Sequence, residues 1–257
     1  MINLLLYAAD ELGYIGGYGG YYYGFDWTYI LVIIGAIITC IASSRVNSTF
    51  KKYSKYRASI GCTGAEIARR MLNQEGIYDV SVEHISGNLT DHYDPKSKVL
   101  RLSDPVYNST SVAAISVAAH ECGHAIQHSE GYEPLKIRSA IVPVANFGSK
   151  AGMYIIIAGC LLSFFQPLIT LGIVLFSFGM IFQLVTLPVE FNASSRALNV
   201  LEESGWLVDE ENKMAGKVLK AAAYTYVAAA AASILSVLRL ILLFGRSKSD
   251  DCFIREN

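Results

Sequence analysis

The stretch AGMYIIIAGCLLSFFQPLITLGIVLFSFGMIFQLVTLPV, residues 151–189, contains no Asp, Glu, Lys or Arg. A bilayer span takes about 20 apolar residues, so this stretch is long enough for two spans. Gln166 and Pro167 lie near its middle, and proline ends or kinks a helix. The stretch therefore predicts two membrane-spanning helices joined by a turn, at about 143–164 and 168–188.

Two shorter uncharged runs, Trp27 to Ser44 and Ala221 to Leu238, lie elsewhere in the chain. The second continues past Arg239, whose long side chain can reach the lipid headgroups from the end of a span. These runs predict further spans at 27–44 and 221–244. A buried helical hairpin of a soluble protein is the alternative, which uncharged runs of 18 or more residues disfavour.

The composition agrees with a membrane protein. Over 257 residues, 53 % are hydrophobic and only 17 % are charged, which excludes a disordered chain. The net charge is -1, from 21 Lys and Arg against 22 Asp and Glu, so no overall positive charge supports nucleic-acid binding. We therefore expect the lipid bilayer, and no nucleic acid, among the partners.

Basic residues near the span ends predict the orientation, because Lys and Arg gather on the cytoplasmic side. Several follow the first span directly, whereas the segment before it has none. We therefore expect the N-terminus outside and residues 45–140 in the cytoplasm. The chain then divides into a Gly/Tyr-rich segment (1–26), a first span (27–44), a cytoplasmic catalytic region (45–140), two spans (143–164 and 168–188), a cytoplasmic helical segment (189–220), a last span (221–244) and a tail (245–257).

Residues 45–140 are typical of a small soluble domain with helices and short strands. The sequence Thr63-Gly64-Ala65-Glu66 has the spacing of a capping box and predicts a helix at 63–75. Turn residues 94–97 separate two short apolar segments and predict a β-hairpin, roughly 87–93 with 98–103. An Ala-rich segment after Ser111 predicts a helix at 111–129.

That last helix carries His120-Glu121-Cys122-Gly123-His124, an H-E-x-x-H motif. Residues four apart share a helix face, so both imidazoles can bind one Zn²⁺, and Glu121 can act as general base and acid. Zinc in such a site activates a water for attack on a carbonyl. Random placement of 5 His and 13 Glu would give about 0.005 such motifs, so we expect a functional site.

A catalytic zinc site needs a third protein ligand. Cys122 faces away from His120 on the helix, and His128 lies about 12 Å along the axis from His120. Glu190 is the first charged residue after 39 uncharged ones, and the span order places it on the same side as the two histidines. We therefore expect Glu190 as the third ligand, with His92, in the predicted hairpin, as the alternative.

Several segments together resemble the YugP-like neutral zinc metallopeptidases of bacterial membranes, and the resemblance covers nearly the whole chain. More distantly, the chain is similar to HtpX-type and CaaX-prenyl proteases. The segments are DWTYILVIIGAIITCIAS (26–43), STFKKYSK (48–55), LTDHYDPKSKVLRLS (89–103), SVAAHECGHAIQ (116–127), PLKIRSAIVPVANFGS (134–149), LVTLPVEFNASSRAL (184–198) and TYVAAAAASILSVLRLILLFG (225–245).

The resemblance implies an α-helical membrane protein with about four transmembrane helices and a small α+β, zincin-like catalytic region. It implies one Zn²⁺ per chain, with His120, His124 and Glu190 as ligands and Glu121 as the catalytic residue. The distant relatives tend to carry an Asp four residues after the Glu ligand, as a partner of a zinc-binding His. Here that position is Ser194, with Asn192 nearby, so a neutral group would orient the histidine.

By the same analogy, an edge strand before the motif helix binds extended substrate through its backbone. The matching segment is Val99, Leu100, Arg101 and Leu102, or else the 89–93 arm. For stabilising the transition state or holding the site, the polar candidates are His92, Tyr93 and Arg196, besides Asn192 and Ser194.

The sequence thus favours a multi-pass zinc endopeptidase of a bacterial cell membrane that cleaves membrane or membrane-proximal proteins. A homo-oligomer or an unknown membrane partner is compatible with this expectation. A non-enzymatic scaffold or assembly factor that keeps the zinc site is the alternative, although an intact Glu121 argues against it. A transporter ranks last, because the predicted spans carry almost no Asp, Glu or His.

Overall fold

The computed structural model describes residues 26–245, so the predicted segment 1–26 and the predicted tail lie almost wholly outside the described residues. Within 26–245 the chain forms long helices and one small sheet. The elements are α2 (Tyr29–Tyr53), α3 (Gly64–Gln74), β1 (Ser81–Ile85), β2 (His92–Asp94), β3 (Val99–Ser103), α4 (Asp104–Tyr107), α5 (Val112–Ser129), α6 (Glu133–Leu161), α7 (Gln166–Glu203) and α8 (Asp209–Phe244).

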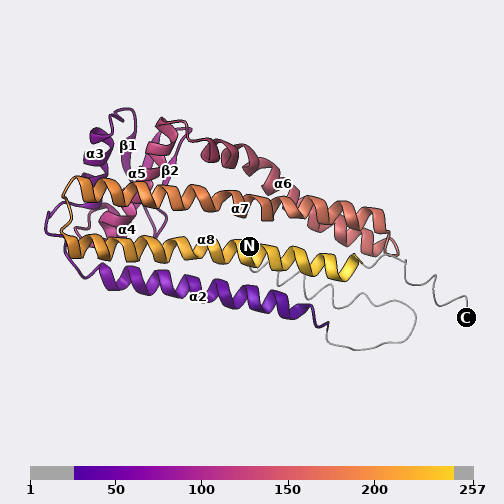
Figure 1. Ribbon diagram of the computed structural model, residues 1–257. Helices are drawn as coiled ribbons and strands as arrows, with labels where there is room; N and C mark the ends of the chain where they lie inside the picture. The colour runs from indigo at the N-terminus through magenta and orange to yellow at the C-terminus, as the bar shows by residue number, and fades with distance from the viewer. Residues whose placement is uncertain (1–25, 246–257) are drawn as a thin grey trace, which may run out of the picture.

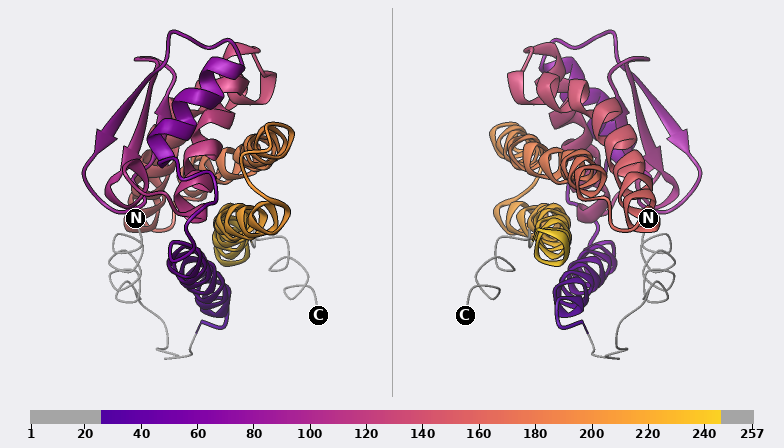
Figure 2. Two further views of the ribbon diagram at one scale, coloured as in Figure 1. Left: turned by 90° about the vertical axis from the view of Figure 1, so that its left-hand side faces the viewer. Right: turned by 90° about the vertical axis from the view of Figure 1, so that its right-hand side faces the viewer.

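Four helices, α2, α6, α7 and α8, are long and apolar enough to cross a membrane, which confirms the prediction of four such helices. They extend in one direction, and α3, the sheet and α5 gather at one end of the molecule (Figures 1 and 2). Each predicted span lies within one of these helices, apart from a few residues at its ends. The helices are longer than the spans, because α7 continues to Glu203 and α8 begins at Asp209.

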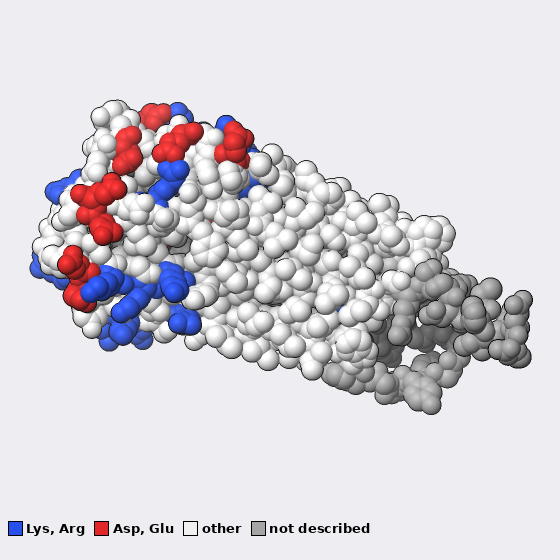
Figure 3. Space-filling view, viewed as in Figure 1, with Lys and Arg blue, Asp and Glu red and all other residues white. Residues whose placement is uncertain are grey.

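Charged side chains gather at the end that carries the sheet, whereas the long helical surface is almost free of them (Figure 3). Large apolar side chains are exposed along this surface, for example Ile37 on α2 and Tyr154 on α6. A soluble protein rarely exposes so continuous an apolar surface. The pattern therefore agrees with a lipid-facing bundle below a polar end.

The α6–α7 hairpin forms where the sequence predicts a turn. Helix α7 begins at Gln166, and Pro167 lies in its first turn, where the missing backbone N–H has no partner to lose. The two helices approach closely through glycines: a Cβ on Gly152 would lie 2.6 Å from the carbonyl oxygen of Gly172. This contact places the two helices side by side over most of the uncharged stretch.

The sheet has the order β1-β3-β2, with β1 parallel and β2 antiparallel to β3. The predicted hairpin is confirmed as β2 and β3, although its first strand covers only His92–Asp94. Since β3 is the middle strand, the expectation that Val99, Leu100, Arg101 and Leu102 pair with substrate is wrong. Residues 99–101 already pair with strands on both sides, and Leu102 pairs with His84. The edge strands of the sheet are β1 and β2, and β2 overlaps the alternative segment, the 89–93 arm.

The predicted helices of this end are also confirmed. Thr63 caps α3 through a capping box with Glu66. Ser111 caps α5, because its hydroxyl accepts a hydrogen bond from the N–H of Ala114 at 3.2 Å. Helix α5 runs through the core of this region, where Ile115 and Ala119 are fully buried, and it packs against α3, α7 and α8.

Candidate metal centre

The H-E-x-x-H motif lies in the second half of α5, on a buried part of the helix. Its helical spacing places the rings of His120 and His124 next to each other, with centroids 4.9 Å apart. Only 8–9 % of the surface of His120, Glu121 and His124 is exposed. Buried polar side chains need partners, so these residues must meet polar groups from other elements.

Helix α7 supplies the side chain that joins the two histidines, that of Glu190. Glu190 is 2 % exposed and lies within α7, where the uncharged stretch ends. Helix α7 can lie against α5 here because residue 123 is glycine: a Cβ at Gly123 would overlap the carbonyl oxygen of Ala193. The position of Glu190 therefore depends on a small residue inside the motif itself.

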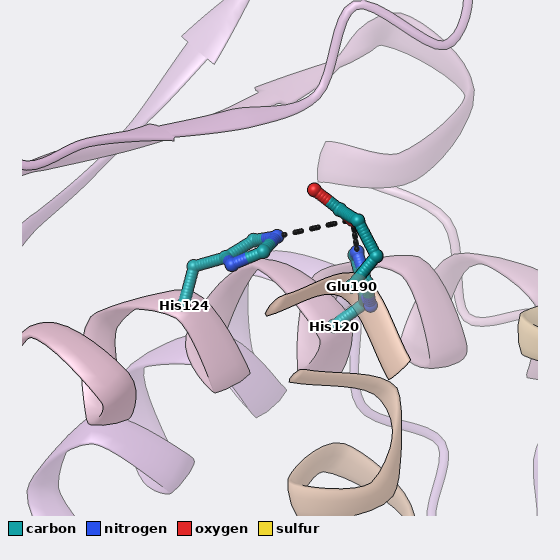
Figure 4. Close-up of side chains that lie close together, drawn as sticks. All are labelled: His120, His124 and Glu190. Atoms are coloured by element: carbon teal, nitrogen blue, oxygen red, sulfur yellow. Dashed lines mark hydrogen bonds and ion pairs between the residues drawn. The ribbon is translucent and has the colours of Figure 1, made fainter. Parts of the chain in front are cut away.

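His120, His124 and Glu190 converge on one point (Figure 4). Oε2 of Glu190 lies 3.3 Å from Nε2 of His120 and 3.5 Å from Nε2 of His124. In a tetrahedral zinc site with bonds of about 2.0–2.1 Å, neighbouring ligand atoms lie about 3.3–3.4 Å apart. Two imidazole nitrogens and one carboxylate oxygen at this spacing fit a zinc ion.

The hydrogen bonds behind His124 support this fit. Gln127 is fully buried, and its Nε2 donates to the carbonyl oxygen of Val189 at 2.8 Å. Its Oε1 therefore faces Nδ1 of His124, 3.1 Å away, and accepts a hydrogen bond from the N–H there. The other ring nitrogen of His124, Nε2, then faces the carboxylate of Glu190 and is the atom left to bind a metal ion.

Uncharged side chains of α7 add further hydrogen bonds around His120 and Gln127. The hydroxyl of Ser194 lies 3.1 Å from Nδ1 of His120. Oδ1 of Asn192 accepts hydrogen bonds from Gln127 at 2.9 Å and from Arg196 at 2.7 Å. Ser194 thus contacts His120 directly, whereas Asn192 contacts Gln127 and not a histidine.

The two glutamates of the site differ in their electrostatics. Burial raises the pKa of Glu121 to about 7, with His120 opposing this shift and Glu190 adding to it. Burial also raises the pKa of Glu190, but hydrogen bonds with His120 and His124 lower it well below the usual value. Glu190 is therefore a carboxylate, as a metal ligand must be, whereas Glu121 can take up and release a proton near neutral pH.

The comparisons with known proteins agree with this geometry. A family described as "Putative neutral zinc metallopeptidase" matches residues 28–245. The chain belongs to this family. It is 49 % identical over 224 residues to "Putative membrane protease YugP" of Bacillus subtilis (strain 168), covering 87 % of this chain and 99 % of that protein. No solved structure matches the chain.

Two other histidines of this family member lie away from the possible metal-binding group. His92, the alternative third ligand, has its Nδ1 2.8 Å from the carbonyl oxygen of Thr90 and its Nε2 3.5 Å from Arg101. Nδ1 of His128 lies 2.8 Å from the hydroxyl of Tyr93. Among the described residues, the group of side chains spaced for one metal ion contains Glu190 and neither of these histidines.

Two further candidates occupy the rim of the site. The Tyr93 side chain packs beside His128, while its backbone N–H lies near the carboxylate of Glu121. Arg196 forms an ion pair with Glu130 at 2.7 Å and stacks over the ring of Tyr132. The backbone of β2 therefore lies near Glu121, and the ion pair of Arg196 joins α7 to the end of α5.

Sequence reasoning missed three residues that the fold of this family member brings to the site. Nη1 of Arg138, on α6, lies 3.6 Å from Oε1 of Glu190, the oxygen not shared with the histidines. The Tyr226 side chain, on α8, lies near Glu190, Glu121 and Arg138. Gln127 is the third. It lies three residues after His124, on the same helix face, and this spacing was the available signal.

Proposed function

We propose that this protein is a zinc-dependent endopeptidase that cleaves membrane or membrane-proximal proteins at the cytoplasmic face of the membrane. The observation that carries the proposal is the convergence of Glu190 from α7 with His120 and His124 from α5. Glu121 lies beside this group on the same helix, as peptide hydrolysis requires.

Zinc held by these three side chains would polarise the scissile carbonyl and make a water molecule acidic enough to react at neutral pH. The Glu121 carboxylate accepts a proton from the attacking water and later donates it to the leaving amine nitrogen. Its pKa of about 7 makes both transfers accessible near neutral pH. Ser194 and Gln127 hold the two imidazoles with their Nε2 atoms toward the metal position.

Tyr226 takes the role of hydrogen-bond donor to the oxyanion that forms on the scissile carbonyl. Its side chain comes from α8 and lies near both Glu121 and Glu190. A preorganised donor of this kind stabilises the developing negative charge. Arg138 positions Glu190 through the oxygen that the histidines leave free. Of the other candidates, His92 contacts the carbonyl oxygen of Thr90, and Arg196 contacts Asn192 and Glu130.

Substrate binds in extended form along the free edge of β2. This strand pairs with β3 on one side only among the described residues, and the N–H of Tyr93 faces Glu121. A peptide added at this edge gains backbone hydrogen bonds and passes the metal group. The site also lies at the end of four membrane-length helices, which favours substrates close to the membrane.

The orientation of the site toward the cytoplasm is part of the proposal. It rests on the basic residues in the last turns of α2 and on the lysines of the first half of α8, at the end of the bundle that carries the site. Cysteine labelling from outside intact cells tests it. A cysteine placed at residues 80–100 is expected to resist a membrane-impermeant reagent, and ready labelling would overturn this orientation.

The Glu121→Gln substitution tests the peptidase function. The glutamine keeps the shape of the side chain but accepts no proton, so we expect the zinc content to persist and cleavage to be lost. Membrane proteins that accumulate in cells with Glu121→Gln, but not in wild-type cells, are the substrates. Glu75→Gln, an exposed change at the end of α3, is the matched control.

Two results would overturn the proposal. One is purified protein that contains no zinc. The other is a Glu121→Gln variant that fully restores the phenotype of a deletion strain, since a scaffold would then explain the function.

A further inference from the structure

A basic pocket lies between α2 and α8, away from the metal centre. It has a volume of about 220 Å³. Four of its lining residues are cationic and none is acidic. The lining residues are Arg45, Thr49, Lys52, Tyr53, Lys217, Lys220, Ala221 and Tyr224.

The helical spacing explains why the cations gather there. Arg45, Thr49 and Lys52 are four and three residues apart on α2, and so share one face. Lys217, Lys220 and Tyr224 are three and four residues apart on α8. The two helices run side by side, so both faces contribute to one pocket.

Aromatic rings of the pocket also interact with its cations. The guanidinium carbon of Arg45 lies 5.3 Å from the ring centroid of Tyr224, and Nζ of Lys52 lies 5.3 Å from that of Tyr53. Cations over aromatic rings are held electrostatically without losing their charge. Among the described residues, none of the four cations forms an ion pair with a carboxylate. The pocket therefore carries uncompensated positive charge.

The position of the pocket along the helices indicates where its ligand lies. Arg45 is the first charged residue after the uncharged run of α2, and Lys220 is the last before the uncharged run of α8. The pocket is therefore level with the boundary between apolar and charged surface, and Lys and Arg side chains gather at this boundary in Figure 3. Lipid phosphates lie at this level of a bilayer.

We propose that this pocket binds the headgroup of an anionic phospholipid. Its Arg and Lys side chains contact the phosphate, and Thr49 and Tyr224 provide hydroxyl groups for the glycerol or headgroup oxygens. The lipid tails lie along the apolar surface of α2 and α8. The bound lipid holds these two helices together at the end that carries the metal centre. This proposal rests on the membrane position of α2 and α8 and is independent of peptidase activity.

Thermal unfolding of the full-length protein in detergent, freed of native lipid, tests the proposal. Phosphatidylglycerol is added in one series, and phosphatidylcholine with the same acyl chains in another. A ligand that binds only the folded state raises the unfolding midpoint. We expect phosphatidylglycerol to raise the midpoint by roughly 3 °C or more at saturation, and phosphatidylcholine to leave it unchanged.

Matched double variants locate the effect. Lys217→Gln with Lys220→Gln removes two lysines of the pocket, whereas Lys51→Gln with Lys55→Gln removes two exposed lysines outside it. Both pairs change the net charge equally. We expect the first pair to lose more than half of the rise and the second pair to keep it. Arg45→Gln provides a second pocket variant if the first double variant folds poorly.

Three outcomes would overturn the proposal. The first is an equal response to the two lipids. The second is an equal loss in both double variants, which would indicate a nonspecific charge effect. The third is the same rise with glycerol phosphate alone at equal concentration, because the ligand would then be a free phosphate compound.

Discussion

The α-carbon of Gly123 on α5 faces the carbonyl oxygen of Ala193 on α7 so closely that no side chain fits between the two helices. Ala193 lies three residues after Glu190, almost one helical turn along α7. The glycine within the H-E-x-x-H motif thus determines how near Glu190 comes to the two histidines.

The Gly123→Ala substitution is therefore expected to displace α7 and impair the metal site. Overpacking of this kind destabilises a protein by about 1–3 kcal/mol. A displacement of about 1 Å near catalytic groups lowers the rate about 100-fold. Zinc content and cleavage rate of the purified variant measure the effect.

Gly216→Ala is the control for this change. Gly216 is also a helical glycine, on α8, but a Cβ there meets no atom within 4 Å. The alanine is expected to leave activity unchanged and to stabilise the protein by up to about 1 kcal/mol through helix propensity. If Gly123→Ala behaved like Gly216→Ala, the close contact would not control the site.

Several features of the fold and site could be predicted from the sequence because they depend on local patterns. Uncharged runs located the four long helices, and the spacing of His120 and His124 placed two members of the possible metal-binding group on one helix face. Glu190 could be found because it ends an uncharged run whose direction through the membrane follows from the span order.

Other features depend on packing between distant segments, which local patterns do not specify. Arg138 and Tyr226 look like ordinary residues of α6 and α8 until those helices pack around Glu190. The strand order of the sheet is one such feature, and the prediction of an edge strand at Val99 to Leu102 was wrong because of it. The alternation of Val99 to Leu102 predicts a strand, but only its pairing with β1 shows that it is the middle one.

The Ser194→Ala substitution is expected to weaken zinc binding by about 10- to 100-fold, because Nδ1 of His120 loses the oxygen that orients the ring. The secondary structure should stay unchanged. Competition with a chromophoric chelator measures the affinity. Ser195→Ala, an exposed change at the next position of α7, should bind zinc as the wild type does. Equal affinities in the two variants would contradict a role for Ser194 in holding His120.

The Tyr226→Phe substitution is expected to lower kcat by about 100- to 1000-fold, because it removes one donor to the oxyanion. Zinc content and KM should change little, since the ring and the metal ligands remain. Steady-state kinetics on a cleaved peptide separate the two parameters. Tyr154→Phe, on the exposed surface of α6, is the control. A variant with unchanged kcat and raised KM would assign Tyr226 to substrate binding.

N-methylation of substrate amides tests binding along the edge of β2. An antiparallel or parallel pair bonds an edge strand through every second residue, so only alternate substrate amides should contribute. Each methyl group at a bonded amide removes one hydrogen bond and is expected to lower kcat/KM about three- to tenfold. The substrate recovered with Glu121→Gln supplies the peptide for this scan. Equal sensitivity at successive positions, or none at any, would show that the substrate does not extend the sheet beside His92–Asp94.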